Sequence, residues 1–365
     1  MTDATSGIWR WADRIDPHGA VPTEARITMG EGPAPMVRST RIGPRAGFEL
    51  WLLDLTGQPT LSYKAVFAAS AVSHMIAQGQ TRALLTSSGN TGSAVAAYCA
   101  RAGIECTIAI SDGTPVGKIR KMAAAGASII EVEDFGADPS VDERVLQILT
   151  AAKDQRTAML VSNYLYSPEG MKGAETFPYF IDAEAGLQRL DHVFVPAGSG
   201  ALARAVAEGF SHPTVTHKPA VHLVQPEGCD TIATALREGR DDGTVLDRAT
   251  TAVTGLKVPF LLDVAPVIAM ARSSGGTGFV GSDREIYDAQ ARLAREEGIL
   301  AEPAGAASLM GALKALDEGI IRQHDVVICL VTGSVFNDED AFARMTEGNL
   351  PQRLSVDALA DGLNS

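Results

Sequence analysis

The sequence lacks the features that mark disulfide-linked, membrane-spanning or nucleic-acid-binding proteins. Its 4 cysteines are scattered without a CxxC pair, which argues against a disulfide framework and a zinc knuckle, so no metal is expected. The most apolar stretches, such as 261–271, are short and interrupted by Asp or Pro, whereas a membrane-spanning helix needs about 20 mostly apolar residues. With 44 acidic and 31 basic residues, the chain carries a net charge of -13 and has no dense basic cluster. Neither nucleic acid nor a membrane is expected as a partner.

Aromatic residues are also few, at 5%, but glycine and aliphatic residues are plentiful. The chain has 36 glycines, 45% hydrophobic residues and 21% charged residues, a composition typical of a globular protein. A length of 365 residues favours two α/β lobes with a shared cleft over one ordinary core. The N-terminus has no basic start followed by an apolar segment, as a secretory signal would. We therefore expect a cytoplasmic protein.

The hydrophobic pattern alternates between short β-branched runs and alanine-rich helical segments, which is typical of parallel sheets with crossover helices. In a first series we predict strands and helices at 83–86, 91–101, 106–110, 118–125, 128–132, 141–152 and 158–161. In a second series we predict elements at 170–183 (one helix), 192–195, 201–208, 220–224, 284–296, 304–317 and 326–331. The glycine-rich segment 273–282 is predicted to be a loop. The predicted fold class is α/β with two parallel-sheet lobes.

Glycine-bearing loops follow three of the predicted strands, at 87–92 (SSGNTG), 196–200 (PAGSG) and 332–334 (TGS). Ligands of open α/β sheets collect at the carboxyl ends of strands, so the three loops could surround one ligand. The first loop stands where a helix exposes unpaired N–H groups, which can bind an anion, although a plain helix cap explains it equally well. The second could bind a phosphate through its backbone, but it lacks the GxGxxG spacing of a dinucleotide site.

Lys64 ends the segment PTLSYK at 59–64, ahead of a long helix of small residues. Between Tyr63 and Ala65 its amine could be desolvated, which favours the neutral form that makes a Schiff base with a carbonyl group. A solvated surface lysine is the commoner alternative.

Five segments, in order, resemble the tryptophan-synthase-like (type II) fold family of pyridoxal-phosphate enzymes, and within it the threonine synthases. They are GEGPAPM at 30–36, PTLSYK at 59–64, SSGNT at 87–91, EPAGAAS at 302–308 and TGS at 332–334. The resemblance covers most of the chain and implies an enzyme that uses pyridoxal 5'-phosphate. We expect residues 1–68 and 164–365 to form a large cofactor-binding domain, and residues 69–163 a small mobile substrate domain. A homodimer is expected.

The resemblance also implies roles for individual residues. Lys64 would hold the cofactor and, once a substrate displaces it, move the α-proton. Asn90 would hydrogen-bond the phenolic oxygen of the ring, and Thr332 would face the pyridine nitrogen, where a neutral hydroxyl suits elimination and replacement better than transamination. The cofactor phosphate would be bound by Ala197, Gly198, Ser199, Gly200 and Ala201. The substrate carboxylate would be held by Ser87, Ser88 and Thr91.

Three positions depart from the threonine synthase pattern. Ala65 and Val66 stand where Asp and often Arg are expected, and Ser167, in NYLYSPEGMK at 163–172, stands at the place of an arginine. Arginine binds a phosphate through two parallel hydrogen bonds, which lysine does not reproduce. The pattern therefore argues against O-phosphohomoserine as the substrate, unless Lys118, Arg120 or Lys172 serves its phosphate.

The predicted function is that of a pyridoxal-phosphate-dependent lyase or synthase that eliminates or replaces a β- or γ-leaving group of a small amino-acid substrate. A nonstandard amino acid of specialised metabolism is one candidate. The alternatives are threonine synthase proper, a serine or threonine dehydratase, a non-catalytic homologue with a binding role, and a nucleotide-binding α/β protein.

Overall fold

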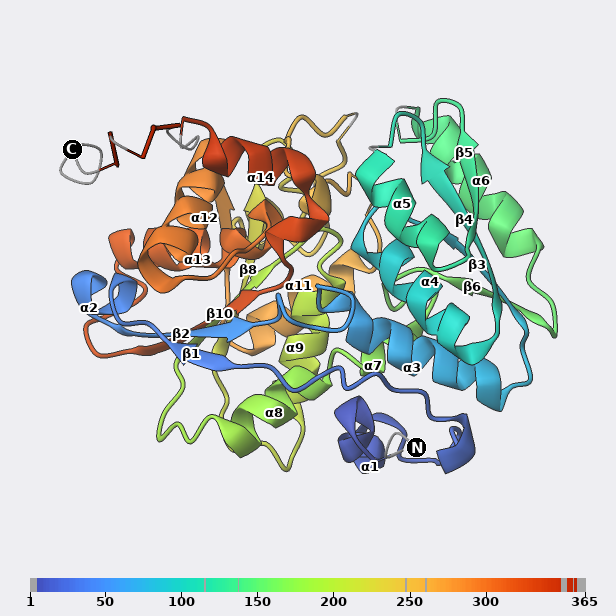
Figure 1. Ribbon diagram of the computed structural model, residues 1–365. Coiled ribbons are helices and arrows are strands. Elements are labelled where there is room, and N and C mark those ends of the chain that lie inside the picture. The colour runs from blue at the N-terminus through green and yellow to red at the C-terminus, as the bar shows by residue number, and fades with distance from the viewer. Residues whose placement is uncertain are drawn as a thin grey trace.

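The fold contains two separate sheets (Figure 1). The computed structural model describes residues 5–114, 116–136, 138–246, 248–259, 261–348, 353–356 and 358–359. The first lobe has a six-stranded sheet of order β1-β2-β10-β7-β8-β9, with β1 (Met36–Arg38), β2 (Glu49–Asp54), β7 (His192–Pro196), β8 (Ala220–Pro226), β9 (Gly278–Gly281) and β10 (Val326–Val331). The second lobe has a four-stranded sheet of order β5-β4-β3-β6, with β3 (Arg82–Thr86), β4 (Glu105–Ser111), β5 (Ser128–Val132) and β6 (Thr157–Leu160). All paired strands are parallel except β1 and β2, which confirms the predicted α/β class with two parallel-sheet lobes.

Helices cover the sheets. The long ones are α3 (Lys64–Ala77), α4 (Asn90–Ala102), α5 (Val116–Ala124), α6 (Pro139–Ala151), α8 (Thr176–Glu184), α9 (Ala201–Ser211), α11 (Val264–Ser273), α12 (Asp283–Glu297), α13 (Pro303–Asp317) and α14 (Glu339–Thr346). Shorter ones are α1 (Ala12–Ile15), α2 (Ile42–Ala46), α7 (Pro168–Lys172), α10 (Ala233–Arg237) and the 3₁₀ turns η1 (Gly7–Trp11), η2 (Thr23–Ala25), η3 (Thr254–Leu256) and η4 (Val335–Asn337). Within the described ranges, no helix is long and apolar enough to cross a membrane.

The central strands of the first lobe are buried on both faces. In β10, Ile328 and Leu330 belong to one hydrophobic cluster, which includes α9, whereas Val327, Cys329 and Val331 belong to another, which includes α13. Successive side chains of a strand point to opposite faces, so a continuous apolar run is what a doubly covered strand requires. Polar loops can therefore gather only at the ends of these strands.

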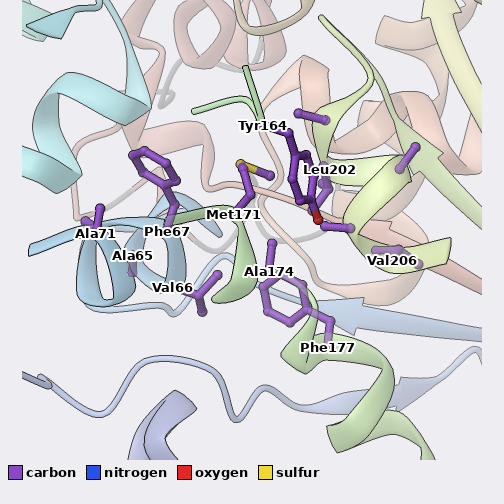
Figure 2. Packing of buried hydrophobic residues seen from close by; sticks show 14 of the residues in the cluster. Ala65, Val66, Phe67, Ala71, Tyr164, Met171, Ala174, Phe177, Leu202 and Val206 are labelled. Atoms are coloured by element: carbon purple, nitrogen blue, oxygen red, sulfur yellow. The ribbon is translucent and has the colours of Figure 1, made fainter. Parts of the chain in front are cut away.

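Helix α3 connects the two lobes and packs against both α4 and α7. Its residues Ala65, Val66 and Phe67 are fully buried, and Figure 2 shows them with Met171 and other residues of the same cluster. This packing fixes the first turn of α3, and with it the position of Lys64.

Two predicted elements are wrong. Residues 170–183 form α7 and α8 rather than one helix, and a Cβ added to Gly173 would lie 2.1 Å from the carbonyl oxygen of Val66, so the break lies at a close approach to α3. The glycine-rich segment 273–282 contains β9, where a Cβ on Gly278 would lie 2.1 Å from the carbonyl oxygen of Ala233. Glycine serves close backbone contact at both places. Strands β1 and β2 are not predicted, while the other predicted elements agree with the structure to within about three residues.

Candidate active site

Three of the segments singled out in the sequence leave the same edge of the six-stranded sheet. Strands β2, β10 and β7 are parallel neighbours, so their carboxyl ends lie side by side. The lysine loop follows β2, the segment 332–334 follows β10, and the segment 197–200 follows β7.

The lysine loop is held by the segment after β10. Leu61 has a φ of 59°, and its carbonyl oxygen accepts hydrogen bonds of 2.9 Å from Ser334 N–H and of 2.9 Å from the Asn337 side-chain amide. A left-handed conformation costs a non-glycine residue about 1–2 kcal/mol, so it persists where neighbouring contacts impose it. The N–H of Tyr63 donates to the carbonyl oxygen of Thr332 at 2.9 Å. These contacts place Lys64 at the first position of α3, beside the end of β10.

The amine of Lys64 lies where the two lobes meet. Its Nζ donates to Ser162 Oγ at 2.6 Å and lies 4.6 Å from the ring centroid of Tyr63. Ser162 Oγ is in turn 3.1 Å from Thr91 Oγ1. Ser162 follows β6 and Thr91 lies in α4, so both belong to the second lobe. Sequence reasoning missed Ser162, although its place just after a predicted strand, next to the segment 163–172, was a usable signal.

Asn90 lies at the start of α4, and its side-chain Nδ2 donates to both carboxylate oxygens of Glu302, at 2.9 and 3.0 Å. Glu302 is buried, with 6% of its surface exposed, just before α13. Burial raises the pKa of Glu302 to about 7, while the hydrogen bond from Asn90 acts in the opposite direction. A Cβ on Gly333 would lie 2.4 Å from Glu302 Oε1, so a side chain there would displace the Glu302 carboxylate. The first and third loops thus meet at Glu302, a residue that the EPAGAAS segment contains but for which no role was predicted.

The serine hydroxyls of the first loop bind backbone within their own lobe. Ser87 Oγ accepts N–H groups of Gly89 at 3.2 Å and Gly92 at 3.0 Å. Ser88 Oγ accepts the N–H of Ser111, at the end of β4, at 2.9 Å. Of the three residues predicted to bind the substrate carboxylate, only Thr91 is linked to the Lys64 amine, through Ser162. The role of Ser87 and Ser88 stays a prediction.

The second loop begins at Ala197 and turns into α9. Gly200 has a φ of 80°, a conformation in which glycine is unstrained. The carbonyl oxygen of Gly198 accepts a hydrogen bond from the Gln225 side-chain amide at 3.0 Å. The N–H groups of the first turn of α9, from Ala201 onward, have no partner within the helix, and a helix N-terminus favours anions. The loop therefore suits a phosphate group.

The three departures from the threonine synthase pattern are buried. Ala65 and Val66 are fully buried, and Ser167 is 4% exposed with its Oγ accepting the N–H of Val161 at 3.0 Å. Lys172 pairs with Glu175 at 2.9 Å. None of these groups is an arginine free to bind a substrate phosphate.

The match to a known family agrees with this arrangement. A family model described as "Pyridoxal-phosphate dependent enzyme" matches residues 27–333, so the chain belongs to this family of enzymes and uses pyridoxal 5'-phosphate. Within it the chain is threonine synthase-like. The threonine synthase of Methanocaldococcus jannaschii is 29% identical over 93% of this chain and 83% of its own length. The threonine synthase of Mycobacterium tuberculosis H37Rv is 28% identical over 86% of this chain and 84% of its own length.

Solved structures show the same fold at lower identity. The structure of threonine deaminase isoform 2 from Solanum lycopersicum has a TM-score of 0.73 and 20% identity, covering 95% of this chain and 96% of that one. A maize serine racemase structure has a TM-score of 0.69 and 20% identity, covering 100% of this chain and 98% of that one. These likenesses extend to both lobes.

The residues present fit the cofactor. Lys64 supplies a primary amine, Asn90 an amide donor, Thr332 a buried hydroxyl-bearing side chain, and the N-terminus of α9 an anion site. In addition, Ser62 Oγ, two residues before the lysine, is buried and has no hydrogen-bond partner among the described residues. Burying a hydroxyl without a hydrogen-bond partner costs free energy. Such a hydroxyl is expected where a bound ligand supplies the missing partner.

Proposed function

We propose that this enzyme eliminates or replaces a β- or γ-leaving group of an amino acid, with Lys64 as the residue that holds the cofactor and moves the α-proton. The observation that carries the proposal is the position of Lys64 Nζ, 2.6 Å from Ser162 Oγ at the junction of the two lobes. Bound pyridoxal 5'-phosphate supplies an electron sink that weakens the Cα–H bond of an attached amino acid. A general base must lie within hydrogen-bond reach of the group that it deprotonates, and Lys64, as the residue that holds the cofactor, would lie beside the Cα of the attached amino acid.

Ser162 and Thr91 would orient the amine during the reaction. Their hydroxyls are 3.1 Å apart and Ser162 accepts from Lys64, so together they form a short hydrogen-bonded chain. Such a chain holds Nζ in one direction and offers a path for a proton to and from it. Thr91 would also bind the substrate carboxylate, together with Ser87 and Ser88.

Asn90, Thr332 and the segment from Ala197 to Ala201 would bind the cofactor. In this proposal Asn90 donates to the phenolic oxygen, Thr332 faces the pyridine nitrogen with a neutral hydroxyl, and the helix N-terminus binds the phosphate. A neutral partner at the nitrogen supports elimination and replacement over transamination.

The proposed substrate carries a leaving group other than the phosphate of O-phosphohomoserine. The support is local, because Ala65 and Val66 are buried apolar residues and the Ser167 hydroxyl is bound to backbone. The curated threonine synthases that the chain resembles favour the second candidate, threonine synthase proper. Serine or threonine dehydration is a third, and a homologue that binds without catalysis is a fourth.

A screen of amino acids against the purified holoenzyme tests the proposal. Changes in the visible absorbance of the bound cofactor report which compounds react, and product analysis separates elimination from replacement. We expect a β- or γ-substituted amino acid to change the spectrum and release its leaving group. The proposal is contradicted if no β- or γ-substituted amino acid changes the spectrum.

Three organisational features belong to the same proposal. Residues 69–163, which contain all strands of the second lobe, would move as a small domain against residues 1–68 and 164–365. The enzyme would be a cytoplasmic homodimer. Light scattering gives the oligomeric state, and fractionation of cells gives the location.

A further inference from the structure

Asn337 uses both ends of its side-chain amide to connect the two lobes. Its Oδ1 accepts a hydrogen bond from Lys121 Nζ at 2.7 Å, and its Nδ2 donates to the carbonyl oxygen of Leu61 at 2.9 Å. Lys121 lies on α5 in the second lobe, whereas Leu61 lies in the loop that leads to Lys64. Because ammonium groups only donate and carbonyl oxygens only accept, the amide can take only one orientation here.

The lobes meet near Asn337 through long side chains rather than through a packed apolar surface. A cavity of about 270 Å³ lies between α5 on one side and η3, η4 and the start of α14 on the other. Lys121 also donates to the carbonyl oxygen of Phe336 at 2.6 Å, and Lys118 donates to Thr254 Oγ1 at 2.9 Å. Of these two lysines, Lys121 reaches η4, where Asn337 lies, whereas Lys118 reaches η3.

The loop end of this connection is conformationally strained. Leu61 has a φ of 59°, and its carbonyl oxygen is held by Ser334 N–H and by Asn337. Strained backbone persists only where its surroundings impose it. Removing one of the two donors therefore allows the loop to relax, and Lys64 follows that loop directly.

We propose that Asn337 is a positioning residue that transmits the position of helix α5 to the loop that carries Lys64. When α5 is in the described position, Lys121 holds the Asn337 amide and the amide holds Leu61. When α5 moves away, the amide loses one of its two anchors, and the loop is released from the geometry that directs Lys64 toward Ser162. The functional part of this inference rests on the proposed role of Lys64.

The test compares Asn337→Ala and Lys121→Met with the matched control Lys118→Met. The two lysines reach from the same helix to the same lobe, but only Lys121 reaches Asn337. Hydrogen exchange is followed in the holoenzyme and the cofactor-free protein for residues 58–64 and for the N–H of Ser334. Loss of one neutral hydrogen bond corresponds to an exchange rate about three- to tenfold higher, and we expect this in both test variants and not in the control.

Visible circular dichroism of the bound cofactor is the second readout, because it reports how the ring is held and is insensitive to a uniform loss of stability. We expect it to change in both test variants and to keep the wild-type form in Lys118→Met. The inference is overturned if Lys121→Met and Lys118→Met give the same exchange rates and the same circular dichroism. If Asn337→Ala does not fold, the comparison of the two lysine variants is still a complete test. If the cofactor still attaches after Lys64→Ala, the role of Lys64 is wrong, whereas the exchange result stands independently.

Discussion

Asn90 and Glu302 are joined by two hydrogen bonds, in which the amide nitrogen lies 2.9 and 3.0 Å from the two carboxylate oxygens. They lie 212 positions apart in the chain, on different lobes. The pair therefore holds the start of α4 against the start of α13. Glu302 is buried, which raises its pKa to about 7. Its charge therefore changes near neutral pH, where most carboxylates are fully ionised.

The stability of the protein should depend on pH through Glu302. Burial raises the pKa of Glu302 from 4.5 to about 7, so between these values the folded state binds more protons than the unfolded state. Its contribution to stability is therefore full below pH 4.5 and is lost as the pH rises through 7. At about 1.4 kcal/mol per pKa unit, the loss amounts to roughly 3 kcal/mol.

Glu302→Gln should remove this dependence while keeping an oxygen for the Asn90 amide. Urea unfolding of the cofactor-free protein at pH 5 and pH 8 measures it. We expect the variant to lose less stability than the wild type between the two pH values. Parallel pH profiles for both proteins would show that Glu302 titrates normally. Glu296→Gln is the control. Glu296 pairs with Arg292 and with the exposed Arg45, and the variant should leave the wild-type profile unchanged to within about 1 kcal/mol.

Lys64→Ala should fold and lose covalent attachment of the cofactor, because Lys64 is the lysine whose amine lies between Tyr63 and Ser162. Borohydride reduction of the holoenzyme followed by peptide mapping identifies the labelled residue. In the wild type the label is expected on the peptide that contains Lys64. A label on Lys118 or Lys172 would show that the motif has been aligned wrongly.

Ser162→Ala should slow the reaction and leave the cofactor in place. The variant removes the hydroxyl that accepts from Lys64 Nζ at 2.6 Å. A hydrogen bond to a charged group contributes about 1.5–3 kcal/mol, which corresponds to a fall in kcat of about 10- to 100-fold. Steady-state rates together with cofactor content measure it. The control is Ser140→Ala, which removes an exposed hydroxyl near the start of α6 and should keep the wild-type rate. If Ser162→Ala also keeps the wild-type rate, Ser162 takes no part in the reaction.

The parts of this structure that follow from local patterns could be predicted from the sequence. Gly103 ends α4 in a left-handed conformation with a φ of 68°, and the apolar run of β10 agrees with its predicted bounds. The loop segments at the strand ends are also predictable, because each is marked by glycines directly after an apolar run. What could not be predicted depends on distant packing. The contact of Ser162 with Lys64 joins residues 98 positions apart, and Gly173 breaks a helical pattern because Val66 lies against it.

O-phosphohomoserine should be a poor substrate or none. The positions at which the threonine synthase pattern has Asp, Arg and Arg are occupied by Ala65, Val66 and Ser167, all of them buried. A phosphate dianion without a guanidinium partner forgoes charge-assisted hydrogen bonds of about 1.5–3 kcal/mol each. Two such losses in the transition state lower kcat/KM by about two to four orders of magnitude, at about tenfold per 1.4 kcal/mol.

Phosphate release from O-phosphohomoserine, compared with turnover of O-phosphoserine, O-acetylserine, serine and threonine, decides the substrate question. Lys118 is the residue to test as a replacement for the missing arginines. In the described part of the chain, the only hydrogen-bond partner of its amine is the neutral Thr254 hydroxyl. If O-phosphohomoserine is turned over fast and preferentially, and Lys118→Met raises its KM without affecting O-acetylserine, then this lysine serves the phosphate and the enzyme is an ordinary threonine synthase. If O-acetylserine or serine is preferred and Lys118→Met leaves that preference unchanged, the buried Ala65, Val66 and Ser167 account for the specificity.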